Sequence, residues 1–443
     1  MTAELDFSIE KLGPCRIASP VMMSRSRNDF MADYMSDDQL VLYNIETTVD
    51  KLNTVCTRNE VLEKAGPREN IFFDSAKVNA GIVTCGGLCP GLNDVIRAMV
   101  MCLWYHYGVK RICGIRYGFR GLLPEYHLPA MDLNPSVVSE IHHHGGTLLG
   151  SSRGGGDQIP AMVDEIERMN LNILFVIGGD GSQKGALAIA EEAQKRGYKL
   201  AVVGVPKTID NDLSFIERSF GFDTAVAEAV RVVAGAHVEA HDAMNGISLV
   251  KVMGRESGYI AAHTALSIND VNFVLIPEVP FDLDGPNGLF VHLKKRLEDR
   301  HHAVIVVAEG AGQNLVGLNK VTDESGNRKL GDIGPFLRDA IAKYFKDLSS
   351  GVTIRYFDPS YLIRSTPANP SDALYCARMG TNAVHAAMAG KTKVLVSLVN
   401  NHFVHVPMKM AVSKRNFVDP EGSLWRDVVN ATGQPALMKN SKS

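Results

Sequence analysis

Short, mostly apolar segments that end in turns of glycine, proline or acidic residues recur along most of the chain. Their length and composition are typical of strands buried in a parallel sheet. We expect such strands at Ala80–Thr84, Arg111–Ile115, Ile173–Ile177, Leu200–Val205, Ile247–Val252, Phe273–Ile276 and Ala303–Ala308. Between them, apolar residues recur at helical spacing over Leu92–Val100, 182–196, Phe222–His237, Ser257–Leu266 and Leu293–Arg300. This alternation predicts parallel sheets with helices on both faces.

The length of 443 residues is too great for one average core, and two or three domains are expected. We predict two Rossmann-like, three-layer α/β/α domains with largely parallel sheets and an active-site cleft between them. Residues 1–78 read as an N-terminal extension, within which 58–70 suggest a helix and a turn. Residues 79–221 with about 362–420 form one predicted domain, and 222–361 with the C-terminal tail form the other.

Composition narrows the class of partner. The chain is 45% hydrophobic and 21% charged, with a net charge of −3, so nothing favours nucleic acid or an anionic membrane surface as a partner. No apolar run approaches the length of a membrane-spanning helix. Seven cysteines, an odd number, fit reduced thiols, and we therefore predict a cytoplasmic protein.

The densest group of reactive side chains is residues 206–212, Pro-Lys-Thr-Ile-Asp-Asn-Asp, directly after a predicted strand. Asp210 and Asp212 are two positions apart and would face the same way in an extended chain. Paired carboxylates suit a general base beside a magnesium ion. The alternative is a plain turn, because Asp and Asn favour turns.

Three glycine-rich loops follow or adjoin predicted strands. The loops at 86–91 and 178–182 each lie between a strand and a helix, where backbone amides can bind phosphate. Asp180 in the second loop can hold magnesium, and Ser182 has an alternative role as a helix cap. The third loop, 145–154, carries Arg153, which could bridge donor phosphates. No Lys-Ser or Lys-Thr pair closes these loops, so none is a Walker loop.

The second half supplies cations. Arg255 follows the strand that ends at Val252, and Arg355, Tyr361 and Arg364 cluster later in the chain. These side chains could hold a second phosphate away from the reacting one. Solvated arginines around a proline turn are the alternative.

Seven motifs together resemble the 6-phosphofructokinase family in order and spacing: GIVTCGGLCPGLNDVIR, GGTLLGSSRG, GGDGSQKGA, PKTIDND, FGFDTA, VKVMGRESGYIA and DPSYLIR. The resemblance covers about residues 79–400. It is strongest to the branch that holds pyrophosphate-dependent, plant and trypanosomatid enzymes. Asn245-Gly246 replaces an arginine of the short bacterial enzymes, so their allosteric circuit is not implied.

The resemblance implies a role for each motif. Asp210 would take the proton from the sugar 1-hydroxyl, Asp180 would hold Mg²⁺, and Arg255 would lie near the moving phosphoryl group. Lys207 and Arg153 would complete the catalytic set. The first domain would bind ATP, through Gly87, Tyr117, Arg153, Gly154, Gly179, Asp180, Gly181, Ser182 and Gly185. The second would bind fructose 6-phosphate, together with the central motif, through Thr208, Asp210, Asp212, Met253, Gly254, Arg255, Glu309, Arg355, Tyr361 and Arg364. Arg355 could reach the 6-phosphate from a neighbouring subunit, and a homo-oligomer, a dimer or a tetramer, is expected.

The resemblance gives conflicting indications about the phosphoryl donor, which could be ATP or pyrophosphate. Gly181 leaves room for the α-phosphate and nucleoside of ATP, whereas pyrophosphate-dependent relatives carry a second Asp there. Lys207 is a feature of the pyrophosphate enzymes. We let the steric argument decide and predict an ATP-dependent, allosteric, glycolytic kinase. The alternatives are the pyrophosphate-dependent reaction, a non-catalytic regulatory subunit, and an NAD or lipid kinase.

Overall fold

The computed structural model describes residues 5–440 except 27, 50–56, 155, 318–328 and 349–350. The chain divides into two compact units. Unit 1 comprises Met1–Thr208, Leu213–Gly221 and Ser365–Arg415, and unit 2 comprises Ile209–Asp212, Phe222–Arg364 and Asn416–Ser443. These boundaries differ from the predicted ranges: residues 209–212, 362–364 and 416–420 fall in the first predicted domain but belong to unit 2.

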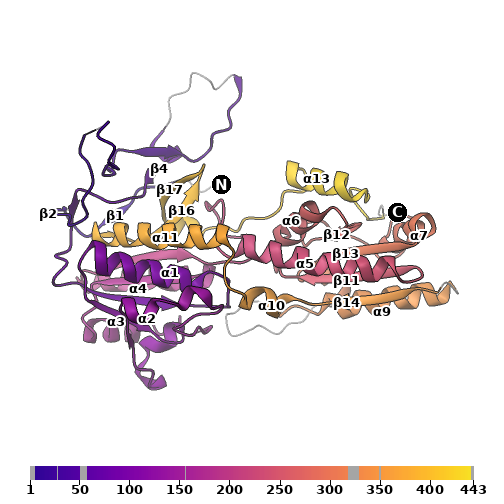
Figure 1. Ribbon diagram of the computed structural model, residues 1–443, viewed down its shortest axis with the longest axis horizontal. Helices are drawn as coiled ribbons and strands as arrows, with labels where there is room; N and C mark the ends of the chain where they lie inside the picture. Colours follow the sequence, from indigo (N-terminus) through magenta and orange to yellow (C-terminus); the bar gives the residue numbers. More distant parts are fainter. Residues whose placement is uncertain are drawn as a thin grey trace. The chain divides into compact units, whose positions relative to one another are not determined.

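Unit 1 is built on a nine-stranded sheet in the order β3-β4-β17-β16-β10-β9-β6-β7-β8 (Figure 1). Its centre, β16-β10-β9-β6-β7, is parallel, and antiparallel strands flank it on both sides. The strands are β3 Leu40–Leu42, β4 Val61–Lys64, β6 Asn79–Thr84, β7 Arg111–Ile115, β8 Met131–Asp132, β9 Ile173–Gly178, β10 Ala201–Pro206, β16 Val394–Val399 and β17 His402–Pro407.

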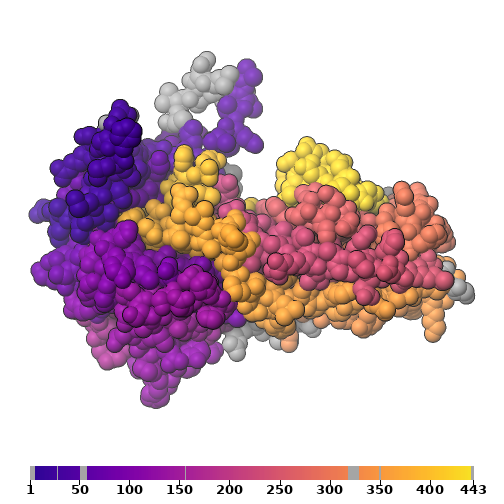
Figure 2. Space-filling view, in the orientation of Figure 1, coloured from indigo at the N-terminus to yellow at the C-terminus, as the bar shows by residue number. Residues whose placement is uncertain are grey.

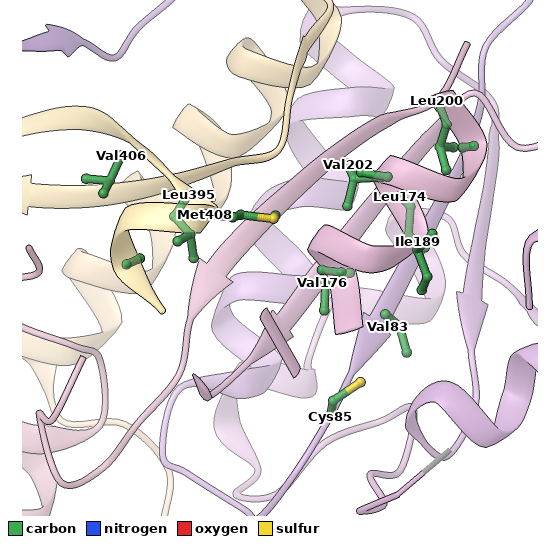
Figure 3. Packing of buried hydrophobic residues seen from close by; sticks show 14 of the residues in the cluster. Val83, Cys85, Leu174, Val176, Ile189, Leu200, Val202, Leu395, Val406 and Met408 are labelled. Atoms are coloured by element: carbon green, nitrogen blue, oxygen red, sulfur yellow. The ribbon is translucent and has the colours of Figure 1, made fainter. Parts of the chain in front are cut away.

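Helices cover both faces of this sheet. Helices α1 (Leu92–Met101) and α11 (Pro370–Met388) pack together, and α3 (Ile159–Arg168) packs with α4 (Asp180–Lys195). Both α4 and α11 contact β10, and Figure 3 shows part of the apolar core that Ile189 of α4 shares with Leu174, Val176 and Val202 of the sheet. All six residues of β9 are buried, as expected for a strand covered on both sides. Shorter helices are α2 Pro135–Val138 and α12 Met408–Ala411.

The N-terminal segment belongs to unit 1 and lies against it (Figure 2). Strand β1 (Glu10–Lys11) pairs with β15 (Lys391–Thr392), and β2 (Ile17–Ala18) pairs with β5 (Asn70–Ile71). The predicted helix within 58–70 is wrong. Only Arg58–Glu60 is helical, as a short 3-10 turn, and the chain then extends into β4 because that strand pairs with β17. Long-range pairing therefore overrides the local helical preference.

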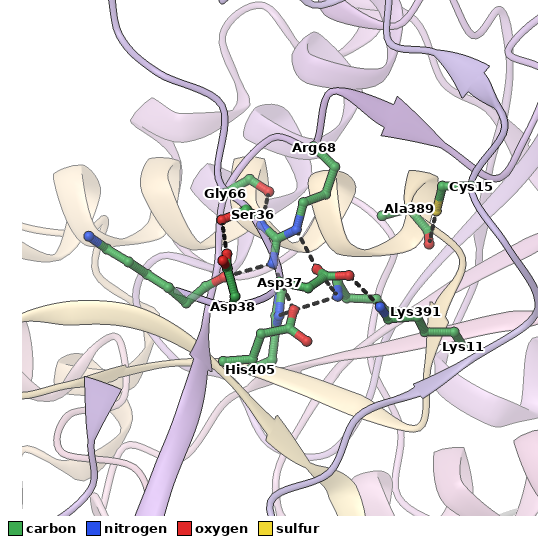
Figure 4. A network of polar contacts seen from close by, with 12 residues as sticks. Lys11, Cys15, Ser36, Asp37, Asp38, Gly66, Arg68, Ala389, Lys391 and His405 are labelled. Carbon is green, nitrogen blue, oxygen red and sulfur yellow. Dashed lines mark hydrogen bonds and ion pairs between the residues drawn. The ribbon is translucent and has the colours of Figure 1, made fainter. Parts of the chain in front are cut away.

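A buried cluster of charges fastens this segment to the sheet (Figure 4). Glu63 on β4 accepts hydrogen bonds from Arg68 (2.7 Å), from His405 (3.0 Å) and from Lys391. Asp37 accepts from Arg68 (2.8 Å) and Lys391 (3.0 Å). Burial lowers the pKa of His405 to about 4, so its imidazole is neutral at neutral pH. Burial alone would raise the pKa of Glu63, but the hydrogen bonds from His405 and Lys391 bring it to about 2.

Unit 2 contains a parallel four-stranded sheet in the order β12-β13-β11-β14. The strands are β11 Gly246–Val252, β12 Phe273–Leu275, β13 His302–Ala308 and β14 Thr353–Phe357. The helices are α5 Phe222–His241, α6 Tyr259–Ile268, α7 Leu289–Arg300, α8 Gln313–Val316, α9 Ile333–Asp347, α10 Ser360–Ser365 and α13 Ser423–Thr432.

Alternate residues of these strands enter two separate cores. On β13, Val304 and Val306 pack with α5 and α6, whereas Ile305 and Val307 pack with α7 and α9. This two-residue period places one helical layer on each face of the sheet. The predicted α/β class with largely parallel sheets is therefore confirmed. Among the described residues, no helix combines the length and apolar character needed to cross a membrane.

The charge cluster yields a prediction about stability. Glu63→Gln keeps the shape but leaves Lys391 and Arg68, both nearly fully buried, with one anion fewer. Breaking a buried ion pair costs about 3–5 kcal/mol, so chemical denaturation should show a loss of that size at pH 7. Asp74→Asn is the control, because its pair with Lys77 is exposed and should contribute about 1 kcal/mol or less.

The same substitution should change the response to acid. Because the folded pKa of Glu63 lies below its ordinary value of 4.5, its contribution is complete above pH 4.5 and is lost as the pH falls towards 2. The stabilities of wild type and Glu63→Gln should therefore converge in acid. A difference that stayed constant down to pH 2 would contradict the assignment of this charge.

Candidate active site

The loops that carry the predicted chemistry of unit 1 leave neighbouring strands at one edge of the sheet. Strands β6, β9 and β10 lie side by side, with Thr84 opposite Ile177 and Gly178 opposite Pro206. Parallel pairing in this register brings the residues after each strand together. The second glycine turn, after β9, therefore begins one strand spacing from the first turn, after β6, and one strand spacing from the central motif, after β10.

The first glycine turn holds the 145–154 loop. Gly86 has φ of 87°, a left-handed conformation that favours glycine, and its amide donates to the Ser152 carbonyl at 2.9 Å. Ser151 Oγ donates back to the Gly86 carbonyl at 2.7 Å. The Arg153 guanidinium lies near Gly87, 3.8 Å from the point where a Cβ would stand. The loop that carries Arg153 is thus tied to the first turn.

Lys207 connects all three strand ends. Its amide donates to the Gly178 carbonyl at 3.0 Å, and its ammonium donates to the Gly87 carbonyl at 2.7 Å. The side chain is only 7% exposed. The structure therefore places a buried ammonium where the two glycine turns meet.

The second glycine turn leads directly into α4. The helix begins at Asp180 with Gly179 as its cap, so the alternative role predicted for Ser182 as the cap is wrong. A Cβ on Gly181 would meet no atom within 4 Å, so the space beside it is open. The Asp180 carboxylate pairs with Lys184 of the next turn at 2.8 Å. The structure also places Gly185 against Phe119, at a packed position.

The Asp180 carboxylate could bind a magnesium ion that enters the site together with a phosphate-bearing ligand. Within the described ranges, no group of three or more His, Cys, Asp or Glu side chains is arranged to hold a metal ion by itself. Mg²⁺ commonly uses one or two carboxylates together with substrate phosphates and water. A single carboxylate beside open space and the amides of a glycine turn fits that arrangement.

Tyr117 packs against the same loop. It has φ of 55°, and a Cβ on Gly150 would stand 2.7 Å from its ring. Its amide donates to the Leu149 carbonyl at 2.9 Å, and its carbonyl accepts from Ser152 Oγ at 2.5 Å. The structure therefore brings Tyr117 and the Arg153 loop together in unit 1.

The central motif passes from unit 1 to unit 2 after Thr208. The expected extended geometry is wrong, because Ile209 and Asp210 form a turn and Asn211 has φ of 56°. Asp210 is held in unit 2 at two points: its Oδ2 accepts from the Arg255 amide at 3.3 Å, and its carbonyl accepts from Ser257 Oγ at 2.8 Å. The Asp212 carbonyl accepts from the Asn416 amide at 2.8 Å.

Strands β11 and β13 deliver the next group. They end side by side, with Val252 opposite Ala308, and the Gly310 amide donates to the Gly254 carbonyl at 3.0 Å. Gly254 has φ of 132°, which favours glycine. Burial raises the pKa of the Glu309 carboxyl, while the Arg255 guanidinium opposes that rise. Met253, Gly254, Arg255 and Glu309 therefore stand together with Asp210 at this edge of unit 2.

The predicted second phosphate group is only partly assembled. Tyr361 and Arg364 share helix α10, where the guanidinium lies 4.4 Å from the centre of the tyrosine ring. Arg355 lies apart from them, because it stands opposite Ser248 in the sheet and pairs with Glu239 of α5 at 3.3 Å. Within one chain, Arg355 is thus directed away from the strand ends.

Comparison with known proteins settles the family. The phosphofructokinase family model matches residues 79–387, which is more than half of the chain. A protein of Borreliella burgdorferi named ATP-dependent 6-phosphofructokinase is 55% identical to it over 98% of both chains. The chain belongs to the phosphofructokinase family. This confirms the predicted resemblance.

Plant and trypanosomatid phosphofructokinases are also close relatives, as predicted. The chloroplastic ATP-dependent 6-phosphofructokinase 5 of Arabidopsis thaliana is 45% identical over 93% of this chain and 80% of its own length. The ATP-dependent enzyme of Trypanosoma brucei brucei is 42% identical over 96% and 87%. A pyrophosphate-dependent phosphofructokinase structure from Marinobacter aquaeolei superposes with a TM-score of 0.66, covering 82% of this chain and 96% of that one. At 20% identity it shows the fold alone.

Several residues that shape this phosphofructokinase site escaped the sequence reasoning. Gln183 is fully buried, and its Nε2 donates to the carbonyls of Gly178 (2.9 Å), Val176 (3.2 Å) and Val205 (3.2 Å). It therefore joins the ends of β9 and β10. In the sequence, Gln183 looks like an ordinary polar surface residue of a helix. Only the structure shows that its side chain is buried on the sheet-facing side of α4.

Glu278 has a similar role in unit 2. Its Oε1 accepts from the amides of Gly258 and Val418, both at 2.9 Å, and so links the loop after Arg255 to the segment beside Asp212. Burial raises the pKa of this carboxyl, while the two amides oppose the rise. Nothing in the local sequence marks it, because both partners are distant in the chain.

The buried glutamine leads to a testable expectation. Gln183→Met matches its shape but removes the donor to three carbonyls, so we expect the free energy of unfolding to fall by about 1–3 kcal/mol. Chemical denaturation measures this directly. Glu191→Met, at an exposed position of the same helix, should change stability by no more than about 0.5 kcal/mol. Equal effects of the two substitutions would contradict a special role for Gln183.

Proposed function

We propose that this phosphofructokinase transfers the γ-phosphoryl group of ATP to the 1-hydroxyl of D-fructose 6-phosphate, as a step of glycolysis. The relative that is 55% identical over nearly the full length bears the name of this activity and carries the proposal. The geometry supports it from two sides: amide-rich glycine turns around a buried cation in unit 1, and a held carboxylate with nearby arginine in unit 2.

Unit 1 would bind the donor. Amides of the turns at 86–87 and 178–181 would contact phosphate oxygens, and Lys207 and Arg153 would offset their charge. Tyr117 would lie beside the nucleoside. The helix α4, which begins at Asp180, adds the favourable end of its dipole. Mg²⁺ would be held by Asp180 and the donor phosphates, and when bound it would neutralise charge on the phosphoryl oxygens.

Unit 2 and the central motif would bind the sugar phosphate. Met253, Gly254 and Glu309 would contact the sugar, while Tyr361 and Arg364 would hold its 6-phosphate. Arg255 would stabilise the transferring group, since phosphoryl transfer depends on positioning and on cations at the equatorial oxygens.

Asp210 would act as the general base. It would take the proton of the 1-hydroxyl as the sugar oxygen attacks the γ-phosphorus and the bond to the ADP oxygen breaks. The Arg255 amide holds one oxygen of its carboxylate, which fixes the direction of the other. Thr208 and Asp212 would orient the sugar from either side of the turn. A non-catalytic subunit would have no use for this carboxylate.

The proposal of ATP over pyrophosphate rests on space. A side chain at Gly181 would point into the open region beside the helix start, where no protein atom lies within 4 Å of its Cβ. The relatives at 42–55% identity are named as ATP-dependent. Turnover of fructose 6-phosphate and Mg²⁺ with ATP and with pyrophosphate, assayed separately, tests the choice. Turnover with pyrophosphate alone would overturn it.

Arg355 supports the expectation of a homo-oligomer. It stands on β14, at an edge of the unit 2 sheet, with about half of its side chain exposed. An arginine directed away from its own strand ends is suited to reach a sugar phosphate bound by a second copy of the chain. We propose that it does so.

The base is tested by Asp210→Asn, which preserves shape and removes the proton acceptor. Turnover should fall about 10²- to 10⁴-fold, with little change in the KM for fructose 6-phosphate. Steady-state kinetics measure both quantities. Asp242→Asn, at an exposed position after α5, should keep wild-type turnover. A turnover within threefold of wild type would remove Asp210 from this role.

The donor space is tested by Gly181→Asp. The added carboxylate would face the donor phosphates in a closed site, where like charges cost several kcal/mol, so ATP turnover should fall at least about 10³-fold. Folding should survive because the position is open. Gly235→Asp is a matched control, at another open helical glycine, and should keep ATP turnover. Substantial ATP turnover by Gly181→Asp would refute the steric argument.

A further inference from the structure

Helix α10, which carries Tyr361 and Arg364, is short and mostly lies at the surface. It spans only Ser360–Ser365, and so short a helix has little intrinsic stability. Ile363 alone among its residues is buried, whereas the Tyr361 side chain is largely exposed. Something outside the helix must therefore set the position of its two phosphate-binding candidates.

The start of α10 is fastened by Asp358. This residue follows β14, and its Oδ1 accepts hydrogen bonds from the Ser360 amide (3.2 Å) and the Ser360 hydroxyl (2.6 Å). A carboxylate in this place satisfies a helix-start amide that has no partner within the helix. The direction of α10 therefore depends on where this carboxylate is held.

Lys251 holds that carboxylate. Strand β11 runs parallel to β14 with Val250 opposite Phe357, so Lys251 and Asp358 are the next residues along each strand. The Lys251 ammonium lies 2.8 Å from Asp358 Oδ2 and 3.0 Å from Asp332 Oδ1. Its side chain is 12% exposed, so the pair is shielded from water.

The same strand leads into the sugar-binding candidates. Met253 and Arg255 follow Lys251 by two and four positions, and the Lys251 charge, with that of Arg255, opposes the rise in the pKa of Glu309 that burial causes. Burial alone would lower the pKa of Lys251, but the hydrogen bonds that its ammonium donates to Asp358 and Asp332 raise that pKa above its ordinary value. The ammonium is therefore charged throughout the neutral range.

We propose that Lys251 is a positioning residue for the sugar 6-phosphate, which acts by joining the Met253–Arg255 loop to α10 through Asp358 and Ser360. The inference rests on the proposed function, because it assigns the 6-phosphate to Tyr361 and Arg364. Lys251 touches no reacting group. Its effect is on the affinity for the phosphorylated sugar and leaves the chemical step alone.

The test compares the two carboxylates that share the lysine. Asp358→Asn and Lys251→Met should each raise the KM for fructose 6-phosphate about five- to thirtyfold, the range expected for a lost cap, with kcat and the KM for ATP within twofold. Asp332→Asn is the matched control: its carboxylate is equally close to Lys251 but has no contact with α10, so the KM should stay within twofold. Lys251→Arg should restore most of the affinity.

A double variant sharpens the comparison. If Lys251 acts through Asp358, the double variant Lys251→Met with Asp358→Asn should have the same KM as the single variant with the higher KM. Both substitutions would then remove the same interaction, so their effects would not add. Should Lys251→Met fail to fold, Asp358→Asn with its control carries the test. If these variants raised the KM for fructose 6-phosphate, lowered kcat and raised the KM for ATP to a similar extent, the role of Lys251 would be merely structural and the inference would be overturned.

The two proposals fail in different ways. If wild type did not turn over fructose 6-phosphate, the proposed function would fall and this inference with it. If wild type were active and Lys251→Met or Asp358→Asn kept the wild-type KM, or Asp332→Asn raised it equally, only the positioning role would be overturned.

Discussion

Parallel pairing of β6, β9 and β10 is the constraint on which the first half of the site depends. These strands are buried on both faces, so polar residues can be placed only where the strands end. The register of the strands brings those ends level with one another. Polar residues and glycines that are far apart in the chain thereby share one edge. Such an edge suits phosphoryl transfer, which needs positioned amides and cations more than it needs reactive groups.

Side chains within the protein stabilise those strand ends. Lys207 reaches across to the Gly87 carbonyl, and Gln183 joins β9 to β10 from beneath. Each buries polar atoms, which is favourable only when hydrogen bonds satisfy them. The same principle operates at a larger scale in the Glu63 cluster, where charged groups of the N-terminal segment, β4 and β15 are held together with the neutral imidazole of His405 on β17. Polar networks therefore define both the site and the attachment of the segment that precedes it.

In unit 2, residues that are distant in the chain are also brought to one edge of a parallel sheet. Its strands deliver Met253–Arg255 and Glu309 to one edge, and main-chain amides hold Asp210 and Glu278. Carboxylates that accept hydrogen bonds from amides keep a fixed direction without needing a salt bridge. Asp358 joins the start of helix α10 to Lys251, and the register of β11 and β14 places these two residues side by side.

Much of this protein was determined by its sequence alone. The alternation of apolar segments and helices established the α/β class, and seven ordered motifs established the family, because both are local patterns that can be read without coordinates. Tertiary structure decided what local pattern cannot encode. It made 61–64 a strand through pairing with β17, turned the chain at Ile209–Asp210 and Asn211, and directed Arg355 away from α10. It also supplied partners for Gln183, Glu278 and Lys251 through strand register and burial, which join residues that lie distant in the chain.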